Sequence, residues 1–276
     1  MTEKIIELKK AVYKFDDGTA GLNGTDLTIR RGERAAVIGR NGSGKSTLFL
    51  ALNGILKLSG GEYLFSGTKV KYSGKGRENI KRKVGIVFQN SDNQLFMPSV
   101  LTDVCFGIMN MGFNTAEAEK RAEECLDALG ILSLKDKPIH YLSGGEKKMV
   151  SLAGVLAMEP EVILLDEPYS SLDAIGIAAL NDILYKLNRD GITIVMSDHD
   201  LDRVYGFADT VHIMEKGQVK RCGECGEVFS DTEYINDVFG TSPYIPQIYR
   251  MLGGKDKPPR TRDGLVNFIN RTFKKA

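Results

Sequence analysis

The sequence predicts an α/β fold in which a sheet core is combined with an antiparallel β subdomain, a helical insertion and a small C-terminal helical extension. Three observations predict it. Short apolar runs typical of buried strands recur along the 276 residues. A Gly-rich segment, residues 39–47, joins one of these runs to a helical pattern. Strand character disappears over residues 91–158, and helical patterns take over after residue 231.

The composition is that of an ordinary globular protein, with 42% hydrophobic and 26% charged residues. The 37 Lys and Arg residues nearly balance the 36 Asp and Glu residues, so the net charge of +1 gives no electrostatic reason to expect nucleic acid as the main partner. No stretch approaches the roughly 18 apolar residues of a membrane span, and residues 1–7 contain no apolar signal core. We therefore expect a cytoplasmic protein.

The N-terminal residues predict strands over 5–8 and 22–29, separated by a turn at Asp16-Asp17-Gly18. An aromatic residue lies just ahead of this turn, either Phe15 or Tyr13. Such a ring is suited to stacking on a nucleotide base and is equally suited to packing in the core, and the residues alone leave both alternatives open.

Residues 39–47 match the pattern G-x-x-x-x-G-K-[ST], between a buried strand over 34–38 and a helix over 47–52. Backbone N–H groups of such a loop and the positive end of the helix dipole hold a polyphosphate. Lys45 can reach the outer phosphates, and the Ser46 hydroxyl can bind Mg²⁺. The predicted nucleotide-binding residues of this loop are Gly39, Arg40, Asn41, Gly42, Ser43, Gly44, Lys45, Ser46 and Thr47.

Residues 57–83 are rich in Gly and Lys, and the part from Lys71 to Lys83 predicts a solvated, charged loop. Residues 84–88 predict a strand, with Gln89 at its carboxyl end, where side chains of an α/β sheet point into the ligand crevice. In the helical stretch that follows, Thr115 is suited to cap a helix that ends near Gly130.

A second Gly-rich helix start occurs at residues 142–146, Leu-Ser-Gly-Gly-Glu, and the helix it begins ends before Pro160. A serine followed by glycines at a helix N-terminus is suited to an anion. Helix capping explains Ser143 equally well.

Residues 161–165 form a continuous apolar run, which predicts a buried parallel strand that ends in Asp166 and Glu167. Adjacent carboxylates at such a place are costly unless they meet a cation or a proton, and Mg²⁺ is the natural partner when a phosphate loop is present. Alternation along the strand aims the two side chains differently, so one can serve the metal and the other a water molecule. Another strand, residues 192–196, precedes His199, for which we favour a functional role, whereas His140 and His212 are predicted to be structural.

The C-terminal residues predict one helix with an apolar stripe from Tyr244 to Leu252, and Thr261 is suited to cap a last helix. Cys125 falls on an apolar helix stripe and is predicted to be a core side chain. Cys222 and Cys225 form a single C-x-x-C, which favours a surface turn because a zinc site would need a second pair; a redox or stray metal site is the alternative.

Taken together and in this order, these signals resemble those of the nucleotide-binding subunit of an ABC transporter, over nearly the whole chain. The Walker A loop of that family corresponds to residues 39–47, and its Q-loop to Gln89. Its LSGGQ signature corresponds to residues 142–146, with Glu146 in the last position, and Met149 stands where an arginine is common.

The later motifs of the family follow in the expected order. Walker B corresponds to residues 162–166 and is followed by the catalytic glutamate, Glu167. The D-loop corresponds to Leu172-Asp173, the switch histidine to His199, and the adenine-stacking aromatic to Phe15, with Tyr13 as the alternative. Residues 88–96 are similar to the same stretch of cobalt-type energy-coupling-factor (ECF) ATPases, from which Ser91 and Asn93 depart.

The resemblance implies a mechanism in which the signature of one subunit closes on the ATP held by another. Ser143, Gly144 and Gly145, with Glu146 beside them, would bind the γ-phosphate side of the nucleotide from the partner chain. Ser46, Gln89 and, through water, Asp166 would hold Mg²⁺. Glu167 would polarise the attacking water and His199 would contact the γ-phosphate, so the predicted catalytic residues are Lys45, Gln89, Glu167 and His199.

The resemblance also implies partners. We expect an ATPase domain over 1–230, with a helical subdomain at about 91–158, and an extension over 231–276 that helps to pair two ATPase subunits, identical or related. A transmembrane coupling subunit would dock at about 89–111, together with a substrate-binding membrane subunit, at the cytoplasmic face of the membrane. Co²⁺, Ni²⁺ and vitamins stay open as substrates. The alternatives are a soluble ABC protein of DNA repair or translation, which usually has a long coiled coil or two ATPase halves, and a nucleotide sensor without turnover.

Overall fold

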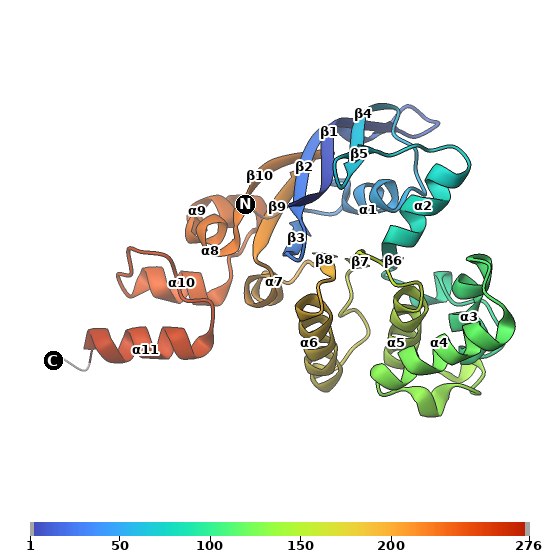
Figure 1. Ribbon diagram of the computed structural model, residues 1–276. Helices are drawn as coiled ribbons and strands as arrows, with labels where there is room; N and C mark the ends of the chain where they lie inside the picture. The colour runs from blue at the N-terminus through green and yellow to red at the C-terminus, as the bar shows by residue number, and fades with distance from the viewer. Residues whose placement is uncertain (1–2, 274–276) are drawn as a thin grey trace.

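The computed structural model describes residues 3–273, which form two sheets with helices around them (Figure 1). The strands are β1 (Lys4–Lys14), β2 (Ala20–Arg30), β3 (Arg34–Ile38), β4 (Gly60–Phe65), β5 (Thr68–Lys69), β6 (Val84–Val87), β7 (Val162–Asp166), β8 (Thr193–Ser197), β9 (Thr210–Glu215) and β10 (Gln218–Glu224). The helices are α1 (Lys45–Asn53), α2 (Lys75–Lys83), α3 (Val100–Asn110), α4 (Thr115–Ala128), α5 (Gly144–Leu156), α6 (Ala174–Arg189), α7 (Leu201–Phe207), α8 (Cys225–Ser230), α9 (Thr232–Phe239), α10 (Tyr244–Met251) and α11 (Arg262–Phe273).

The larger sheet has the strand order β10-β9-β3-β8-β7-β6, and all of its neighbouring pairs are parallel except β9 with the edge strand β10. The carboxyl ends of its parallel strands therefore lie along one edge. Because β8 lies between β3 and β7, Ser197 is the register partner of both Val37 and Asp166. This order brings segments that are far apart in the sequence to one place.

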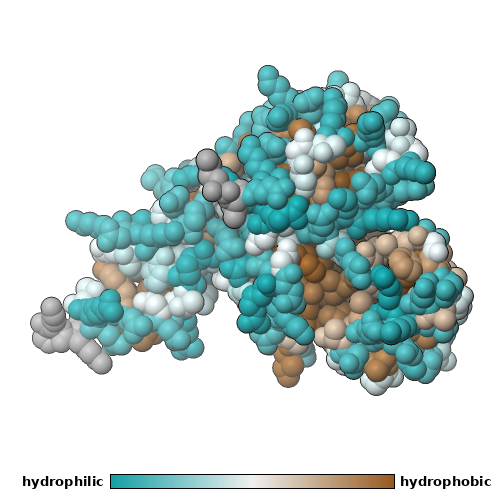
Figure 2. Space-filling view, in the orientation of Figure 1, coloured by the Kyte–Doolittle hydropathy of each residue, from teal (hydrophilic) through white to brown (hydrophobic). Residues whose placement is uncertain are grey.

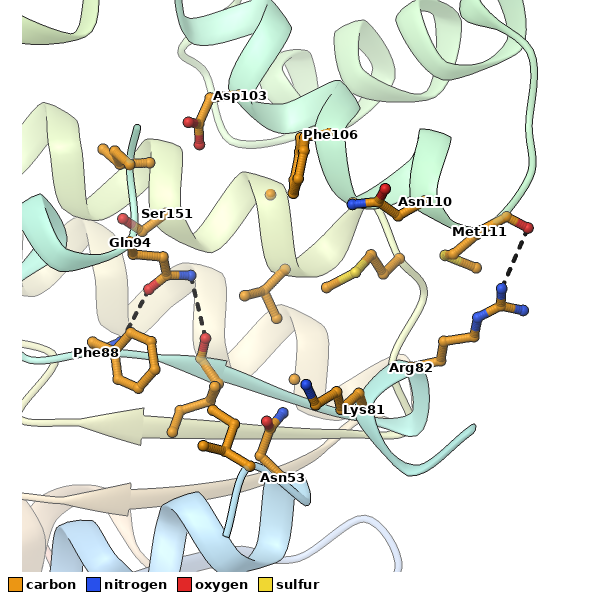
Figure 3. A pocket seen from close by; sticks show the side chains of 18 of the residues that line it. Asn53, Lys81, Arg82, Phe88, Gln94, Asp103, Phe106, Asn110, Met111 and Ser151 are labelled. Carbon is orange, nitrogen blue, oxygen red and sulfur yellow. Dashed lines mark hydrogen bonds between the residues drawn. The ribbon is translucent and has the colours of Figure 1, made fainter. Parts of the chain in front are cut away.

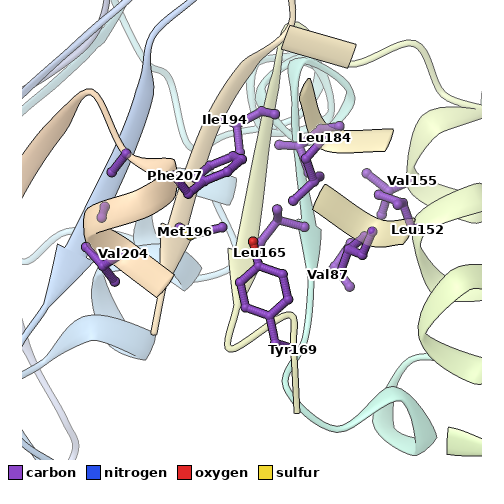
Figure 4. Packing of buried hydrophobic residues seen from close by; sticks show 14 of the residues in the cluster. Val87, Leu152, Val155, Leu165, Tyr169, Leu184, Ile194, Met196, Val204 and Phe207 are labelled. Atoms are coloured by element: carbon purple, nitrogen blue, oxygen red, sulfur yellow. The ribbon is translucent and has the colours of Figure 1, made fainter. Parts of the chain in front are cut away.

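Hydrophobic clusters cover both faces of the larger sheet, as expected for parallel strands. Alternation along β3 sends Ala36 and Ile38 into one cluster and Ala35 and Val37 into the other. Figure 4 shows part of the first cluster, where side chains from α5, α6 and α7 lie around those of the strands. The second cluster contains residues of α1 and of the smaller antiparallel sheet, whose order is β2-β1-β4-β5.

Helices α3, α4 and α5 lie between β6 and β7 in the chain and beside the sheet core in space (Figure 1). Figure 2 shows hydrophilic residues over much of the visible face and hydrophobic ones gathered between α6 and α5.

The sequence had suggested Thr115 as the cap of α4, but the cap is Asn114. Asn114 Oδ1 accepts a hydrogen bond from the backbone N–H of Glu117 at 3.0 Å, and the Glu117 carboxylate accepts from Asn114 N–H at 3.3 Å.

The prediction of a loop over 71–83 was wrong from Lys75 onward, because residues 75–83 form α2. Its cationic residues are the solvated face of a helix that buries Ile80 against the second cluster. Glu78 lies in the first turn and three cations lie in the last turn, an arrangement that complements the helix dipole. Arg77 adds hydrogen bonds to the carbonyls of Gly54 and Ile55 at 3.0 and 2.7 Å.

Cys222 and Cys225 do not form the surface turn that was predicted. Cys222 is an exposed residue of β10, whereas Cys225 is the buried first residue of α8, where burial raises the pKa of its thiol to about 12. Within residues 3–273 no group of three or more His, Cys, Asp or Glu side chains is placed to hold a metal ion.

The predicted cap of the last helix is confirmed, since Thr261 Oγ1 accepts a hydrogen bond from Gly264 N–H at 3.1 Å. No helix in this same part of the chain combines the length and apolar character of a membrane span.

His212 on β9 is 5% exposed, and neither of its ring nitrogens has a hydrogen-bond partner in the described part of the chain. Burial lowers the pKa of its imidazole from 6.5 to about 4. The unfolded chain therefore binds a proton at this site more readily than the folded chain does. The contribution that neutral His212 makes to the free energy of unfolding is fully present above about pH 6.5 and is lost as the pH falls toward 4.

We expect His212→Leu to make folding less sensitive to acid. Between pH 7.5 and pH 5 the protonation of this histidine lowers the free energy of unfolding of the parent by about 2 kcal/mol. The variant does not show this loss, because leucine takes up no proton. Chemical denaturation of both chains at the two pH values measures the difference. An equal loss of unfolding free energy in parent and variant would show that His212 is not an acid-sensitive group.

Candidate active site

A cavity of about 890 Å³ opens at the carboxyl edge of the larger sheet. It gathers residues that follow β3, β6, β7 and β8, together with the turn between β1 and β2. Its lining residues are Phe15, Thr19, Ala20, Gly21, Asn41, Gly42, Ser43, Gly44, Lys45, Ser46, Thr47, Gln89, Asp166, Glu167 and His199. Most of the predicted site residues are therefore neighbours, although they are spread over more than half of the chain.

The loop before α1 has the geometry of a phosphate cradle. Gly42 and Gly44 have positive φ angles of 77° and 104°, which glycine adopts without steric cost. A Cβ atom on Gly39 would lie 2.4 Å from the backbone oxygen of Met214, so this position needs glycine as well. No acidic residue lies in the first turn of α1, whose first N–H groups have no acceptor within the helix, and residues 44–47 line the cavity.

Lys45 extends back along this loop. Its ammonium donates to the Gly39 carbonyl at 2.7 Å and to the Arg40 carbonyl at 3.3 Å, and these two predicted residues are not among those that line the cavity. Burial lowers the pKa of Lys45, and the nearby carboxylates of Asp166 and Glu167 oppose that shift. An ammonium has three donors, and a phosphate oxygen is a suitable acceptor for the third.

Ser46 and Asp166 meet across the cavity floor. The Ser46 hydroxyl donates to Asp166 Oδ2 at 2.9 Å, and the buried Ser197 hydroxyl donates to Asp166 Oδ1 at 2.5 Å. Hydroxyl and carboxylate oxygens, with the side-chain oxygen of Gln89 close by in the same lining, form the all-oxygen set that suits Mg²⁺. The residues present therefore fit this ion.

Glu167 is held in an unusual backbone conformation. Its φ angle is +46°, which costs a non-glycine residue on the order of 1 kcal/mol or more. Its N–H group donates to the backbone oxygen and the hydroxyl of Ser197, both at 3.1 Å, and these contacts stabilise the turn. The result aims its carboxylate into the cavity, where Oε2 accepts from Gln89 Nε2 at 2.7 Å and lies 3.6 Å from His199 Nδ1.

Of the two candidate aromatic residues, Phe15 lines the cavity and is 42% exposed. Tyr13 meets it edge-on, with ring centroids 5.1 Å apart, and packs against the second hydrophobic cluster. Gly21 lies between Phe15 and Thr47, and a Cβ atom there would be 2.9 Å from the Phe15 ring and 2.7 Å from Thr47 Cγ2. Phe15 is therefore the candidate aromatic residue that lies at the cavity.

The second Gly-rich segment does not line this cavity in its own chain. Ser143 and Glu146 form a capping box at the start of α5: Ser143 Oγ accepts from Glu146 N–H at 3.3 Å, and Glu146 Oε2 accepts from Ser143 N–H at 2.7 Å. Lys137 adds an ion pair to Glu146 at 3.0 Å. The N–H groups of Gly144 and Gly145, in the first turn, have no acceptor within the helix, which leaves them available to an acceptor from outside it.

Comparison with known proteins decides the family. Residues 22–170 match the family model described as ABC transporter. The chain is 42% identical over 273 residues to the energy-coupling factor transporter ATP-binding protein EcfA of Methanocaldococcus jannaschii, an alignment that covers 96% of this chain and 98% of that protein. The chain belongs to the ABC transporter family. It is an ATPase whose hydrolysis of ATP is coupled to transport.

Further relatives agree with this assignment of the ABC ATPase. EcfA3 of Clostridium perfringens is 44% identical over 257 residues, covering 93% of this chain and 90% of that one. The solved structure of cbiO1 from Clostridium perfringens, described as part of the ABC transporter complex cbiONQ, has 43% identity and a TM-score of 0.76 over 90% of this chain and 99% of its own. A dimeric cassette in a post-hydrolysis state, bound to ADP and Pi, has 29% identity and a TM-score of 0.72 over 80% and 99%. The predicted fold and family are confirmed.

Several cavity residues of this ABC ATPase were not found by sequence reasoning. Thr19, Ala20 and Gly21 line the cavity because β2 begins there, and the only signal was their place directly after the turn that Phe15 precedes. Ser197, the last residue of β8, holds both Asp166 and the backbone of Glu167. A polar residue that ends a buried strand is the signal that could have identified it.

Proposed function

We propose that this ABC ATPase is the ATP-hydrolysing subunit of an ECF-type transporter, which imports a small solute, either a transition-metal ion such as Co²⁺ or a vitamin. The convergence of Phe15, loop residues 41–47, Gln89, Asp166, Glu167 and His199 on one cavity carries the proposal, because ATP hydrolysis needs all of these functions in one place. The names of the relatives, which include EcfA and a component of cbiONQ, support the transporter type.

In this proposal each residue of the cavity has its own binding or catalytic role. Phe15 stacks on the adenine, and the loop N–H groups with Lys45 bind the phosphates. Glu167, whose carboxylate faces the cavity, accepts a proton from the attacking water as the water oxygen adds to the γ-phosphorus. The bond from that phosphorus to the oxygen of the β-phosphate breaks, and ADP leaves. His199 contacts the γ-phosphate from the end of β8.

The metal-binding residues form a group of their own. Ser46, Gln89 and, through water, Asp166 would hold Mg²⁺, which when bound neutralises charge on the phosphate oxygens. The hydrogen bond from Ser197 keeps Asp166 turned toward Ser46. The bond from Gln89 to Glu167 ties the metal-binding group to the proposed base.

Two chains are required in this proposal, because the signature residues do not line the nucleotide cavity of their own chain. Ser143, Gly144 and Gly145, beside Glu146, would close on the γ-phosphate bound by a second ATPase subunit, identical or related. The extension at residues 231–276 would help to pair the two. An exposed apolar stripe on α10 supports that role; its residues are Tyr244, Ile248 and Met251.

The membrane partner would dock on a groove between α2, β6, α3 and α5, whose cavity measures about 610 Å³ (Figure 3). Phe96 and Phe106, 64% and 38% exposed, pack edge-on at 4.9 Å along its rim. Gln94 extends from the same segment and bonds to Phe88 N–H at 3.1 Å and to the Ile86 carbonyl at 3.2 Å. A helix of the coupling subunit that fills this groove would therefore touch the segment that positions Gln89, and the chain would lie at the cytoplasmic face of the membrane.

We expect Phe106→Arg to abolish copurification of the membrane subunits, because a charge on the groove rim cannot be buried under an apolar helix without a large cost. ATP binding by the chain is expected to stay normal, since Phe106 does not line the nucleotide cavity. The same substitution at an exposed site of the smaller sheet, Thr68→Arg, is the matched control. Retention of the membrane subunits by Phe106→Arg would place the docking surface elsewhere.

Two measurements test the proposed function itself. Phosphate release by the purified chain separates an ATPase from a nucleotide sensor, and identification of copurifying proteins separates a transporter subunit from a soluble ATPase. Uptake of Co²⁺, Ni²⁺ or vitamins by vesicles that contain the whole complex then distinguishes the solutes. Absence of any membrane protein from the purified complex would overturn the proposal that the chain is a subunit of an ECF-type transporter.

A further inference from the structure

Lys148 is a buried lysine that has no carboxylate partner in hydrogen-bond range among the residues that the structure describes. It belongs to the second turn of α5, the helix that begins with the signature residues, and it is 3% exposed. Its ammonium donates to two consecutive backbone carbonyls, that of Phe88 at 2.9 Å and that of Gln89 at 2.7 Å. An ammonium paired only with carbonyl dipoles is costly to bury, because neither acceptor brings a full negative charge.

The electrostatic surroundings agree with this cost. Burial lowers the pKa of Lys148 to about 8, and the carboxylates of Asp166 and Glu167 act in the opposite direction. Neighbouring Lys147, by contrast, forms an ordinary ion pair with Asp92 at 2.6 Å. A well-packed apolar side chain at position 148 would avoid the cost of the charge, so stability alone does not explain the lysine.

The carbonyl of Gln89 is also the acceptor for a third segment. The Ser170 hydroxyl, which follows Glu167 in the chain, donates to the Gln89 carbonyl at 3.3 Å and to the Glu167 carbonyl at 2.9 Å. The side chain of Gln89 in turn donates to Glu167 Oε2 at 2.7 Å. The signature helix, the Gln89 segment and the turn after Glu167 are thus joined through one peptide group.

We propose that Lys148 is a positioning residue, which fixes the Gln89 peptide to the signature helix and thereby sets where the Gln89 side chain meets Glu167. This inference rests on the role proposed above for Gln89. When a second subunit closes on the signature residues, any movement of α5 is passed to Gln89 through the two hydrogen bonds of Lys148. Docking at the membrane groove acts on the same segment from its other side, so Lys148 connects nucleotide closure to the docking surface.

The test compares Lys148→Met with the parent in the full-length chain. Methionine has nearly the same length and removes the charge and both hydrogen bonds, so it is expected to fold and to bind ATP with unchanged affinity. The kcat for phosphate release is expected to fall between about tenfold and about a hundredfold, the loss typical of a displaced catalytic group. Lys148→Arg should recover much of the rate, because its guanidinium can donate to both carbonyls and a cavity of about 340 Å³ lies beside it. Lys120→Met, at an exposed site on α4, is the matched control and should leave kcat unchanged.

A double-mutant cycle with Gln89→Ala separates positioning from a general structural role. If Lys148 acts through Gln89, then Lys148→Met should cost little further in the Gln89→Ala background. Fully additive losses, or a loss of ATP affinity in place of kcat, would overturn the proposal. If Gln89→Ala is slow but Lys148→Met hydrolyses ATP like the parent, this inference alone fails. If Gln89→Ala itself is harmless, the proposed role of Gln89 fails and this inference fails with it.

Discussion

Glu167→Gln is expected to bind ATP as tightly as the parent and to hydrolyse it about 10²- to 10⁴-fold more slowly, the usual contribution of a general base. The Glu167 carboxylate lines the cavity and contacts both Gln89 and His199. Glutamine keeps the shape and the polar contacts but cannot accept a proton from water at neutral pH. The loss should therefore appear in kcat and leave nucleotide affinity intact.

Single-turnover phosphate release and equilibrium binding of ATP measure the two quantities separately. Glu124→Gln, on the exposed side of α4, is the matched control, and its hydrolysis should equal that of the parent. Because the positive φ angle of Glu167 is held by Ser197 through the backbone, the substitution leaves the turn in place. Hydrolysis by Glu167→Gln at the rate of the parent would remove Glu167 from the role of base.

Ser143→Arg should reduce ATP hydrolysis by about 10²- to 10³-fold, the cost of losing a donor to charge that develops in the transition state. ATP binding to the single chain should stay normal, because Ser143 lies outside the cavity and its side chain is exposed. The lost helix cap costs only about 1 kcal/mol, so the chain should fold. Ser133→Arg, an exposed position in the same helical stretch, controls for the added charge.

Mixing two inactive variants gives a sharper test of the paired arrangement. In a mixed dimer of Ser143→Arg with Glu167→Gln, one composite site contains both substitutions and the other contains neither. Mixing should therefore restore part of the hydrolysis that neither variant shows alone. If the mixture stays as inactive as its components, the signature residues act within their own chain and the two-chain site is wrong.

Much of the site could be predicted because its motifs depend on local backbone geometry. The loop at residues 39–47 needs glycines at fixed places, and the strands before Gln89, Asp166 and His199 are recognisable as short apolar runs. The failures arose where the local pattern carried little or no information. The cations of residues 75–83 hid a helix whose single buried residue, Ile80, gives little periodic signal. Cys225 was assigned to a turn because its burial depends on α7, to which it is not adjacent in the chain.

The sequence by itself determined the chemistry of this protein: a phosphate loop, carboxylates at strand ends and a second Gly-rich helix start, since each is set by neighbours a few residues away. Only the tertiary structure decided which of these meet. The strand order β3-β8-β7-β6 places Ser197 between the phosphate loop and Asp166, and the packing of α5 brings Lys148 to carbonyls about 60 residues earlier in the chain. The partner of a buried polar group is chosen by three-dimensional packing, because desolvation makes any available acceptor valuable wherever it lies in the sequence.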